Sequence, residues 1–278
     1  MSKSSSDKHL LHTSDYNTRF NLDFYLKSFY SGVDIDPNEV AFSAFFLENI
    51  ARILHDEQKR LGNQKALEFG GGPCLWPSLL LAQHVDSIRF CDYAQCNLNA
   101  VSDWIAQKPS AFDWTKYFDS VLAIVGSSKE KRVEWESRLR EALNRGGLST
   151  CDVNDPNCPI LSGKHNDYDI IFSSLCLEAA CLTVEIFNET IKRLVRLLKP
   201  GGLLLLAMVR NESFYYVHEE KFFCLPLDET TVEKALRATK EVVDIHIDSS
   251  DTSTEYKQRN TISDLDGLMI IRAYKIIQ

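Results

Sequence analysis

Two groups of residues, about twenty positions apart, have the types and spacing of a nucleoside-binding site. The short apolar run 66–69 leads into Gly70-Gly71-Gly72-Pro73, the pattern of a buried strand followed by a glycine turn and a helix. Glycine has no side chain, so a ligand can approach the backbone N–H groups of such a turn. Asp92 ends a second strand-like run, 88–92, and a carboxylate there can accept ribose hydroxyls. The chemistry indicated is the binding of an adenosine-like cofactor.

The glycine turn lacks the features of two common phosphate-binding motifs. A Gly-x-Gly-x-x-Gly turn needs a third glycine where the chain has Leu75, and Pro73 has no N–H to donate. A P-loop segment is also missing from the sequence. A small uncharged turn preceded by Glu68 suits a ligand without phosphates, and S-adenosylmethionine is such an adenosine derivative. Asp152 and Val153, after a third strand, are placed to flank its adenine.

Further segments, in the same order along the chain, resemble one family of methyltransferases. These segments are Tyr25 and Tyr30, Glu68 to Pro73, Asp92-Tyr93 with Asn97, Ala111-Phe112-Asp113-Trp114, Cys151 to Val153, Ser174 to Cys181, Leu198 to Gly202, Tyr215-Tyr216 and Leu225-Pro226-Leu227. They resemble the small-molecule methyltransferases that include nicotinamide, phenylethanolamine and indolethylamine N-methyltransferases, from Tyr16 to about Ile271. The resemblance implies an S-adenosylmethionine-dependent N-methyltransferase that acts on a small aromatic or aryl-alkyl amine or azine.

The spacing and the resemblance together assign cofactor contacts to one set of residues. The expected cofactor-binding residues are Tyr25, Tyr30, Gly70, Gly71, Gly72, Trp76, Asp92, Tyr93, Asn97, Asp152, Val153 and Ser174. Tyr25 and Tyr30 would close over the cofactor and the methyl acceptor, because aromatic rings can face a sulfonium or a cationic amine. Phe20, Phe24 and Phe29 are interpreted as packing residues, and Trp76 is either a contact or packing.

Two acids are candidates for proton transfer with an amine acceptor. By the resemblance, Glu178 lies where phenylethanolamine enzymes have an acid that faces the amine, and Asp264 lies in the C-terminal loop. Each would orient the amine or relay its proton, and the alternative for each is a solvated surface acid. The enzyme's main work would be to hold the reacting atoms in line, at roughly 3 Å, with water excluded. The expected substrate-binding residues are Tyr25, Val209, Ser213, Tyr216 and Cys224.

Two departures from the family pattern bear on the substrate. The nicotinamide enzymes have an aspartate where this chain has Val209, and a serine where it has Cys224. A buried amide that loses such partners is destabilised by on the order of 1–3 kcal/mol for each unpaired group. We therefore expect an aryl-alkyl amine or another small apolar nitrogen compound. The alternatives are a nicotinamide, thioether or metalloid methyltransferase of the same fold, and a non-catalytic relative that binds the cofactor or a protein without turnover.

These residues need an α/β sheet to bring them together. We predict a Rossmann-like S-adenosylmethionine methyltransferase sheet, mostly parallel, with strands near 66–69, 88–92, 148–151, 168–173 and 203–209. Segments 242–247 and 268–274 would add an antiparallel C-terminal edge, and 213–227 a hairpin or extended arm. The aromatic segment 16–30 and the amphipathic segment 40–61 predict helices. Residues 14–62 would form an N-terminal helical cover, within a single domain 14–278 that follows a disordered tail 1–13.

Composition limits the partners. The chain of 278 residues has a net charge of −8 and a pI near 5.4, so it has no basic face for nucleic acid. It has no apolar segment long enough to span a membrane and no signal-peptide core, which favours the cytoplasm. The eight cysteines form no Cys-x-x-Cys pair, which predicts free thiols and no metal site. We expect a monomer with a small-molecule nitrogen acceptor.

Overall fold

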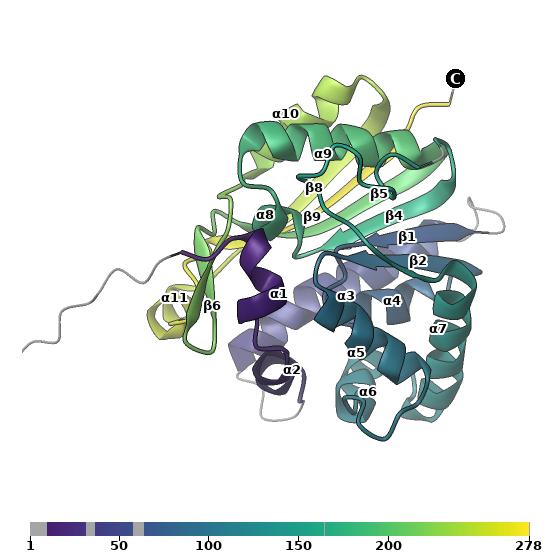
Figure 1. The fold of residues 1–278 in the computed structure, drawn as a ribbon, viewed down its shortest axis with the longest axis vertical. Helices are drawn as coiled ribbons and strands as arrows, with labels where there is room; N and C mark the ends of the chain where they lie inside the picture. Colours follow the sequence, from purple (N-terminus) through teal and green to yellow (C-terminus); the bar gives the residue numbers. More distant parts are fainter. Residues whose placement is uncertain (1–9, 32–36, 58–63, 164, 278) are drawn as a thin grey trace, which may run out of the picture.

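The computed structural model describes residues 10–31, 37–57, 64–163 and 165–277. Its main sheet has seven strands in the order β3-β2-β1-β4-β5-β9-β8 (Figure 1). The strands are β1 Lys65–Phe69, β2 Ser87–Asp92, β3 Leu148–Thr150, β4 Tyr168–Ser174, β5 Leu198–Arg210, β8 Val242–Asp251 and β9 Gly267–Lys275. The first five are parallel, and β9 is antiparallel to both β5 and β8. The predicted parallel sheet with an antiparallel C-terminal edge is confirmed.

The apolar runs form central strands because both faces of the sheet are covered. In β4, Ile170 and Phe172 pack into the core on one face, whereas Ile171 packs into the core on the other. The strand order reverses between β1 and β4, which are paired neighbours. Ligands of open α/β sheets bind at the carboxyl ends of the strands beside such a reversal, so this topology fixes where a site can form.

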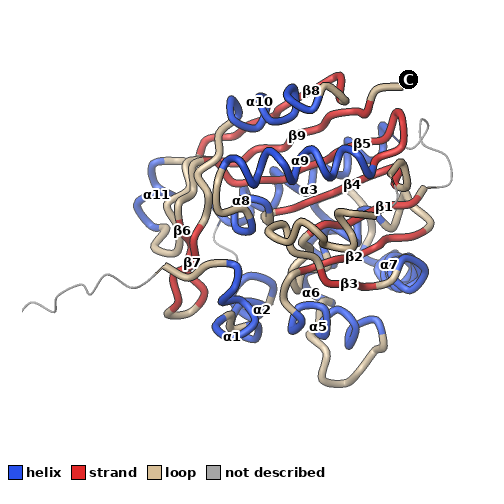
Figure 2. The backbone as a smooth tube through the Cα atoms, turned by 45° about the horizontal axis from the view of Figure 1, so that its top comes forward, coloured by secondary structure: helices blue, strands red, loops and turns tan. Residues whose placement is uncertain are grey.

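Helices lie on both faces of the sheet (Figure 2). One face is covered by α3 Pro37–Glu57, α4 Trp76–Leu81, α5 Gln95–Ile105, α6 Thr115–Ile124 and α7 Arg132–Gly146, with a 3-10 turn η2 at Lys129–Lys131. The other face is covered by α8 Leu177–Ala180, α9 Val184–Leu197 and α10 Glu229–Thr239. In α9, Phe187, Ile191 and Leu194 recur at helical spacing and are fully buried, so this amphipathic helix is held by its apolar stripe.

The N-terminal cover consists of η1 Thr13–Asp15, α1 Tyr16–Arg19, α2 Leu22–Tyr30 and α3. The aromatic segment 16–30 forms two helices instead of one, because the Asn21 side chain caps α2 by accepting the Phe24 N–H. The predicted helix 40–61 is present as α3 up to Glu57, and residues 58–61 lie outside the described ranges.

The expectation of a disordered tail over 1–13 is wrong for residues 11–13. Leu11 is buried, and its N–H donates to the Lys221 carbonyl at 2.8 Å while its carbonyl accepts the Phe223 N–H at 2.8 Å. These bonds pair the segment with β7, so its backbone groups are satisfied as in a strand. Residues 1–9 lie outside the described ranges.

Two features complete the C-terminal half. The predicted arm is a hairpin of β6 Phe214–Val217 and β7 Glu220–Phe223. The loop between β8 and β9 contains a short helix that the sequence analysis missed, α11 Thr254–Arg259, whose N-cap Ser253 accepts the Tyr256 N–H. Among the helices described, none has the length and apolar character needed to cross a membrane.

Candidate active site

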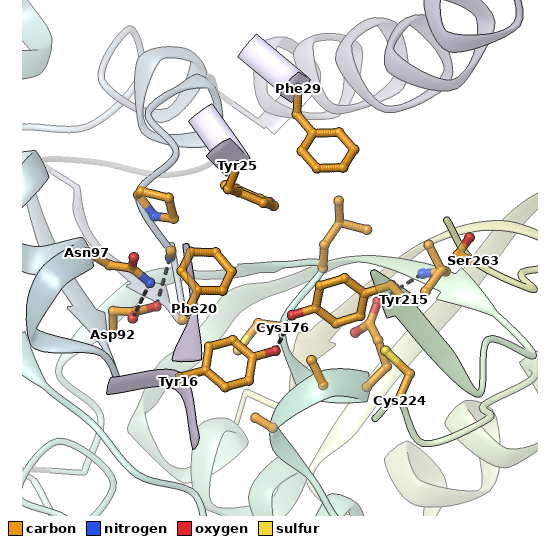
Figure 3. A pocket seen from close by; sticks show the side chains of 18 of the residues that line it. Tyr16, Phe20, Tyr25, Phe29, Asp92, Asn97, Cys176, Tyr215, Cys224 and Ser263 are labelled. Atoms are coloured by element: carbon orange, nitrogen blue, oxygen red, sulfur yellow. Dashed lines mark hydrogen bonds between the residues drawn. The ribbon is translucent and has the colours of Figure 1, made fainter. Parts of the chain in front are cut away.

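A cavity of about 530 Å³ lies at the carboxyl ends of the parallel strands, under the N-terminal cover. Figure 3 shows Asp92 and Asn97 at one end of this cavity and Tyr215 and Cys224 at the other. We call these the glycine-turn end and the hairpin end. The volume is within the range of pockets that bind small molecules and cofactors.

Backbone conformation and close packing together explain the glycine turn. Gly70 and Gly72 have φ of +69° and +62°, where residues with a Cβ are strained. A Cβ on Gly70 would also collide with the Cys176 thiol. Both glycines line the cavity. Gly71, also expected to contact the cofactor, lies outside the cavity wall, and a Cβ on it would strike the Phe90 ring.

Asp92 is the organising acid of the glycine-turn end. Its carboxylate is buried and accepts the N–H groups of Gly72 at 2.8 Å and Ala94 at 2.9 Å, and Asn97 Nδ2–H at 2.9 Å. Burial raises its pKa above the ordinary value, and the three donors act against that shift. An ionised carboxylate has about four acceptor positions, so Asp92 keeps one for a ribose hydroxyl. The buried carboxylate and its remaining acceptor position therefore fit the adenosine cofactor expected from the sequence.

Four more of the expected cofactor residues line the same end of the cavity: Trp76, Tyr93, Asp152 and Val153. Trp76 also packs edge-on against Phe172, with ring centroids 6.4 Å apart, so it is both a cavity wall and a packing residue. Ser174, which we expected to contact the cofactor, lies outside the cavity wall. The chain turns after β4 with Leu175 at φ +50°, so that Leu175 and Cys176 form the wall instead.

Both cover tyrosines reach the cavity. Tyr30 accepts a hydrogen bond from the Cys74 thiol at 3.0 Å, and the Tyr25 hydroxyl lies 3.8 Å from the same sulfur. Burial raises the pKa of both phenols well above the ordinary value, so they stay neutral. Phe20 and Phe29, which we interpreted as packing, also line the cavity (Figure 3). The spacing of aromatic residues along the cover did not separate cavity walls from core.

Glu178 is buried at the hairpin end, with 1% of its surface exposed. Its Oε1 accepts the Val209 N–H at 3.0 Å, whereas its Oε2 is buried without a partner among the described residues. Burial raises the Glu178 pKa to about 8, and the nearby Glu212 adds to this shift. A buried carboxylate oxygen without a partner in a ligand-sized cavity indicates a place for a donor or a cation.

Glu212 is a second buried acid at this end, and the sequence analysis missed it. Its carboxylate lines the cavity and accepts a hydrogen bond from the Cys224 thiol at 3.1 Å. Burial raises its pKa to about 7. Val209, Tyr216 and Cys224, the residues expected to bind the substrate, line this end of the cavity. The sequence feature that could have indicated Glu212 is its place in the short link between the long apolar strand β5 and the hairpin.

Asp264 and Ser213, expected as a proton-transfer and a substrate-binding residue, lie outside the cavity wall and bond to each other. The Asp264 carboxylate is exposed and accepts hydrogen bonds from the Ser213 N–H at 2.8 Å, the Phe214 N–H at 3.2 Å and the Ser213 hydroxyl. Three hydrogen bonds to this carboxylate thus hold the start of β6. Loop position alone did not reveal this, because an acid that faces a ligand and one that caps a strand have the same local sequence.

The sheet order, the glycine turn and the second-strand carboxylate together define the class of S-adenosylmethionine-dependent methyltransferases. Solved structures support the fold. The carbon methyltransferase CurJ superposes with a TM-score of 0.57 at 12% identity, covering 96% of this chain and 62% of that one. Magnesium protoporphyrin IX methyltransferase from Synechocystis, solved with bound S-adenosylmethionine, gives 0.53 at 13% identity, covering 97% and 100%.

The chain belongs to the NNMT/PNMT/TEMT family, whose model matches residues 8–276. Human nicotinamide N-methyltransferase is 29% identical over 80% of this chain and 82% of its own length. Mouse indolethylamine N-methyltransferase is 27% identical with the same coverage. Bovine phenylethanolamine N-methyltransferase is 29% identical over 75% of this chain and 72% of its own length. The protein is thus an S-adenosylmethionine-dependent N-methyltransferase, as the resemblance implied.

Proposed function

We propose that the methyl acceptor is a small aryl-alkyl amine that binds as a cation at the hairpin end. The observation behind this proposal is the pair of buried acids, Glu178 and Glu212, with one Glu178 oxygen left unpaired. A buried carboxylate is unfavourable unless a cation or several donors compensate it. A positively charged amine would supply that compensation, and it would lower the pKa of each acid, which burial raises.

For the cofactor, we propose contacts from the residues that line the glycine-turn end. Asp92 would accept a ribose hydroxyl, and the backbone at Gly70 and Gly72 would face the methionine part. Asp152 and Val153 would flank adenine, and Tyr25 and Tyr30 would close the cavity from above. The expected contributors that also line the cavity are Trp76, Tyr93 and Asn97. When bound, S-adenosylmethionine supplies an electrophilic methyl group on sulfur.

The acid pair would also receive the acceptor's proton. An alkylammonium has no lone pair, so it must lose a proton before its nitrogen can act as a nucleophile. A carboxylate whose pKa lies near 7 or 8 is a better base at neutral pH than an ordinary glutamate. Glu178 and Glu212 would therefore bind the cation and then take its proton, while the aromatic side chains of the cover exclude water.

Two features argue against nicotinamide as the best acceptor. Val209 presents an apolar side chain to the cavity, and its N–H is already used by Glu178. The Cys224 thiol is likewise used by Glu212. A neutral carboxamide would leave the two buried acids without a compensating positive charge. The same argument disfavours a neutral thioether, which would leave both acids uncompensated.

We extend the proposal to the setting of the enzyme. We propose that residues 14–278 form one domain, since the cover and the sheet share one apolar core in which Leu26 and Tyr30 pack with Phe172. We also propose a cytoplasmic monomer without a nucleic-acid or membrane partner. The acidic composition and the eight free cysteines support this proposal.

A methyl-transfer screen tests the proposed substrate class. The enzyme is incubated with S-adenosylmethionine labelled in the methyl group and with phenylethanolamine, tryptamine, nicotinamide, quinoline or a dialkyl thioether. We expect kcat/KM for at least one of the two amines to exceed that for nicotinamide by about tenfold or more, as the loss of one or two buried hydrogen bonds predicts. Faster transfer to nicotinamide or to the thioether would contradict the proposal.

A further inference from the structure

Two phenols from distant parts of the chain meet in the cavity. The hydroxyls of Tyr16, in the N-terminal cover, and Tyr215, in the hairpin, form a hydrogen bond (Figure 3). Burial raises the pKa of both phenols well above the ordinary value. Both therefore keep their protons, and one donates to the other. This bond connects the segment that covers the glycine-turn end with the hairpin that builds the hairpin end.

Aromatic packing surrounds this hydrogen bond. The Tyr215 ring stacks on Phe222, with centroids 5.5 Å apart, and Tyr16 packs against the same ring at 4.9 Å. Tyr16 also stacks on Phe20 at 5.4 Å, and Phe20 packs against Tyr25 at 5.1 Å. A continuous row of rings thus runs from the hairpin to the tyrosine that closes over the cofactor.

Polar contacts outside the cavity join the same two parts. The Leu11 backbone pairs with β7, and the Arg19 guanidinium forms an ion pair with Glu220 at 2.6 Å. The ion pair is exposed and contributes little by itself. At the other end of the hairpin, Asp264 fixes the start of β6 through Ser213 and Phe214. The hairpin is therefore held at its base by Asp264, and the cover contacts it along β7, from Glu220 near the turn to Phe223 at the base.

We propose that the Tyr16–Tyr215 hydrogen bond makes the cover and the hairpin move as one unit, so that this bond must break before the cofactor is released. Tyr16 and Tyr215 are in this view positioning residues. The cover cannot lift from the cofactor while the bond is intact, and breaking it also frees the hydroxyl of Tyr215, which lies in the cavity wall. The two ends of the cavity are coupled through this contact, as a shared two-state element requires.

The coupling rests on the proposed placement of cofactor and acceptor, yet it can be tested with a cofactor product alone. The full-length enzyme is loaded with S-adenosylhomocysteine, and its dissociation rate is measured by stopped flow. The variants are Tyr16→Phe, Tyr215→Phe and the double variant, because phenylalanine keeps the ring and removes the hydroxyl. Tyr168→Phe is the matched control, since Tyr168 lies on β4 outside the cavity wall and packs under Lys65.

We expect each single variant to release S-adenosylhomocysteine about fivefold faster, the effect of one neutral hydrogen bond. The double variant should match the single ones, because both substitutions remove the same bond. Hydrogen exchange of the amides in 11–19 should quicken in the same three variants, with the thermal midpoint of the ligand-free enzyme unchanged.

Three results would overturn this inference. Release could stay within about twofold of the wild-type rate in the single variants. The double variant could instead show the product of the single effects, which would mean that the phenols act separately. Or Tyr168→Phe could release the product as fast as the cavity variants. If the amine screen fails, these three release measurements remain valid tests, because none of them involves a methyl acceptor.

Discussion

The Val209 N–H donates to Glu178 Oε1 at 3.0 Å, which places a buried acid at the position where the family resemblance implies an aspartate in the nicotinamide enzymes. The acid thus reaches this wall of the cavity from α8 instead of from the end of β5. The bond fixes one carboxylate oxygen and leaves Oε2 unpaired among the described residues. An acceptor with a positive charge suits this arrangement better than a neutral amide.

Glu178→Gln keeps the shape of this wall and removes the charge. We expect kcat/KM for the best amine to fall by about tenfold or more, since hydrogen bonds to charged groups contribute about 1.5–3 kcal/mol. The pH profile adds a second readout. The Glu178 pKa is raised to about 8, and the carboxylate must be ionised to act. Wild-type kcat/KM should thus fall as the pH decreases through that region, and an unchanged profile in Glu178→Gln would remove the residue from this role.

Val209→Asp should shift the preference between acceptors. An aspartate here supplies the acceptor for a carboxamide N–H₂ that valine lacks, and it adds a third acid beside Glu178 and Glu212. We expect the ratio of kcat/KM for nicotinamide to that for the amine to rise by roughly tenfold. Val209→Ala, which changes volume without adding a polar group, should leave this ratio near the wild-type value. The substrate argument fails when Val209→Asp leaves the ratio where it was.

Asp92→Ala should weaken S-adenosylhomocysteine binding at least about tenfold, because the variant loses a charge-assisted bond to the ribose and the acceptor that holds Gly72 and Asn97. Isothermal titration measures this directly. Asp248→Ala, at an exposed site on β8, is the control for the loss of one acidic residue. Equal affinities of the wild type and Asp92→Ala would exclude Asp92 from cofactor binding.

Asp264→Asn separates a positioning acid from a catalytic one. The variant loses charge at the base of the hairpin but adds nothing to the cavity wall. We expect KM for the amine to rise a few-fold, as β6 loosens, with the pH dependence of kcat the same as in the wild type. A kcat that no longer varies with pH in this variant would return Asp264 to the catalytic role suggested by the sequence.

Glu68 should make stability depend on pH. It is fully buried, its Oε2 accepts the Ser78 hydroxyl, and burial raises its pKa to about 8. The folded state therefore holds a proton that the unfolded state loses near pH 4.5, so the free energy of unfolding falls as the pH rises from about 4.5 to about 8. In Glu68→Gln this fall should shrink, by up to about 3 kcal/mol between pH 5.5 and pH 8. Urea unfolding of both proteins at the two pH values measures this. The same change in the free energy of unfolding in the wild type and in Glu68→Gln would contradict it.

The fold was predictable because its signals are local and strong. The apolar core of β4 and the glycine turn after β1 have few alternative interpretations, and the parallel order follows once helices lie between the strands. Asp92 was predictable for the same reason, since its function follows from its place at the end of a strand. The N-terminal tail was not, because the pairing of Leu11 with β7 depends on a hairpin two hundred residues away in the chain.

The hairpin end was only partly predictable. Glu178 was found through a family segment, but Glu212 lies in a stretch without periodicity, and only the tertiary structure shows that it is buried beside Cys224. Asp264 was assigned to the site by the family resemblance in the C-terminal loop, and Ser213 was expected to bind the substrate from the arm that follows β5. In the structure Ser213 donates hydrogen bonds to Asp264. Sequence patterns do not show whether a polar side chain bonds to a neighbouring loop or to a ligand.

A crystal structure of the enzyme with S-adenosylhomocysteine and the best amine from the screen is the most direct test. We predict a ribose hydroxyl on Asp92, the homocysteine part along Gly70 and Gly72, and the amine nitrogen within hydrogen-bond distance of Glu178 Oε2 and the Glu212 carboxylate. An amine whose nitrogen points away from both acids, or a ribose that leaves Asp92 without a ligand contact, would contradict the account.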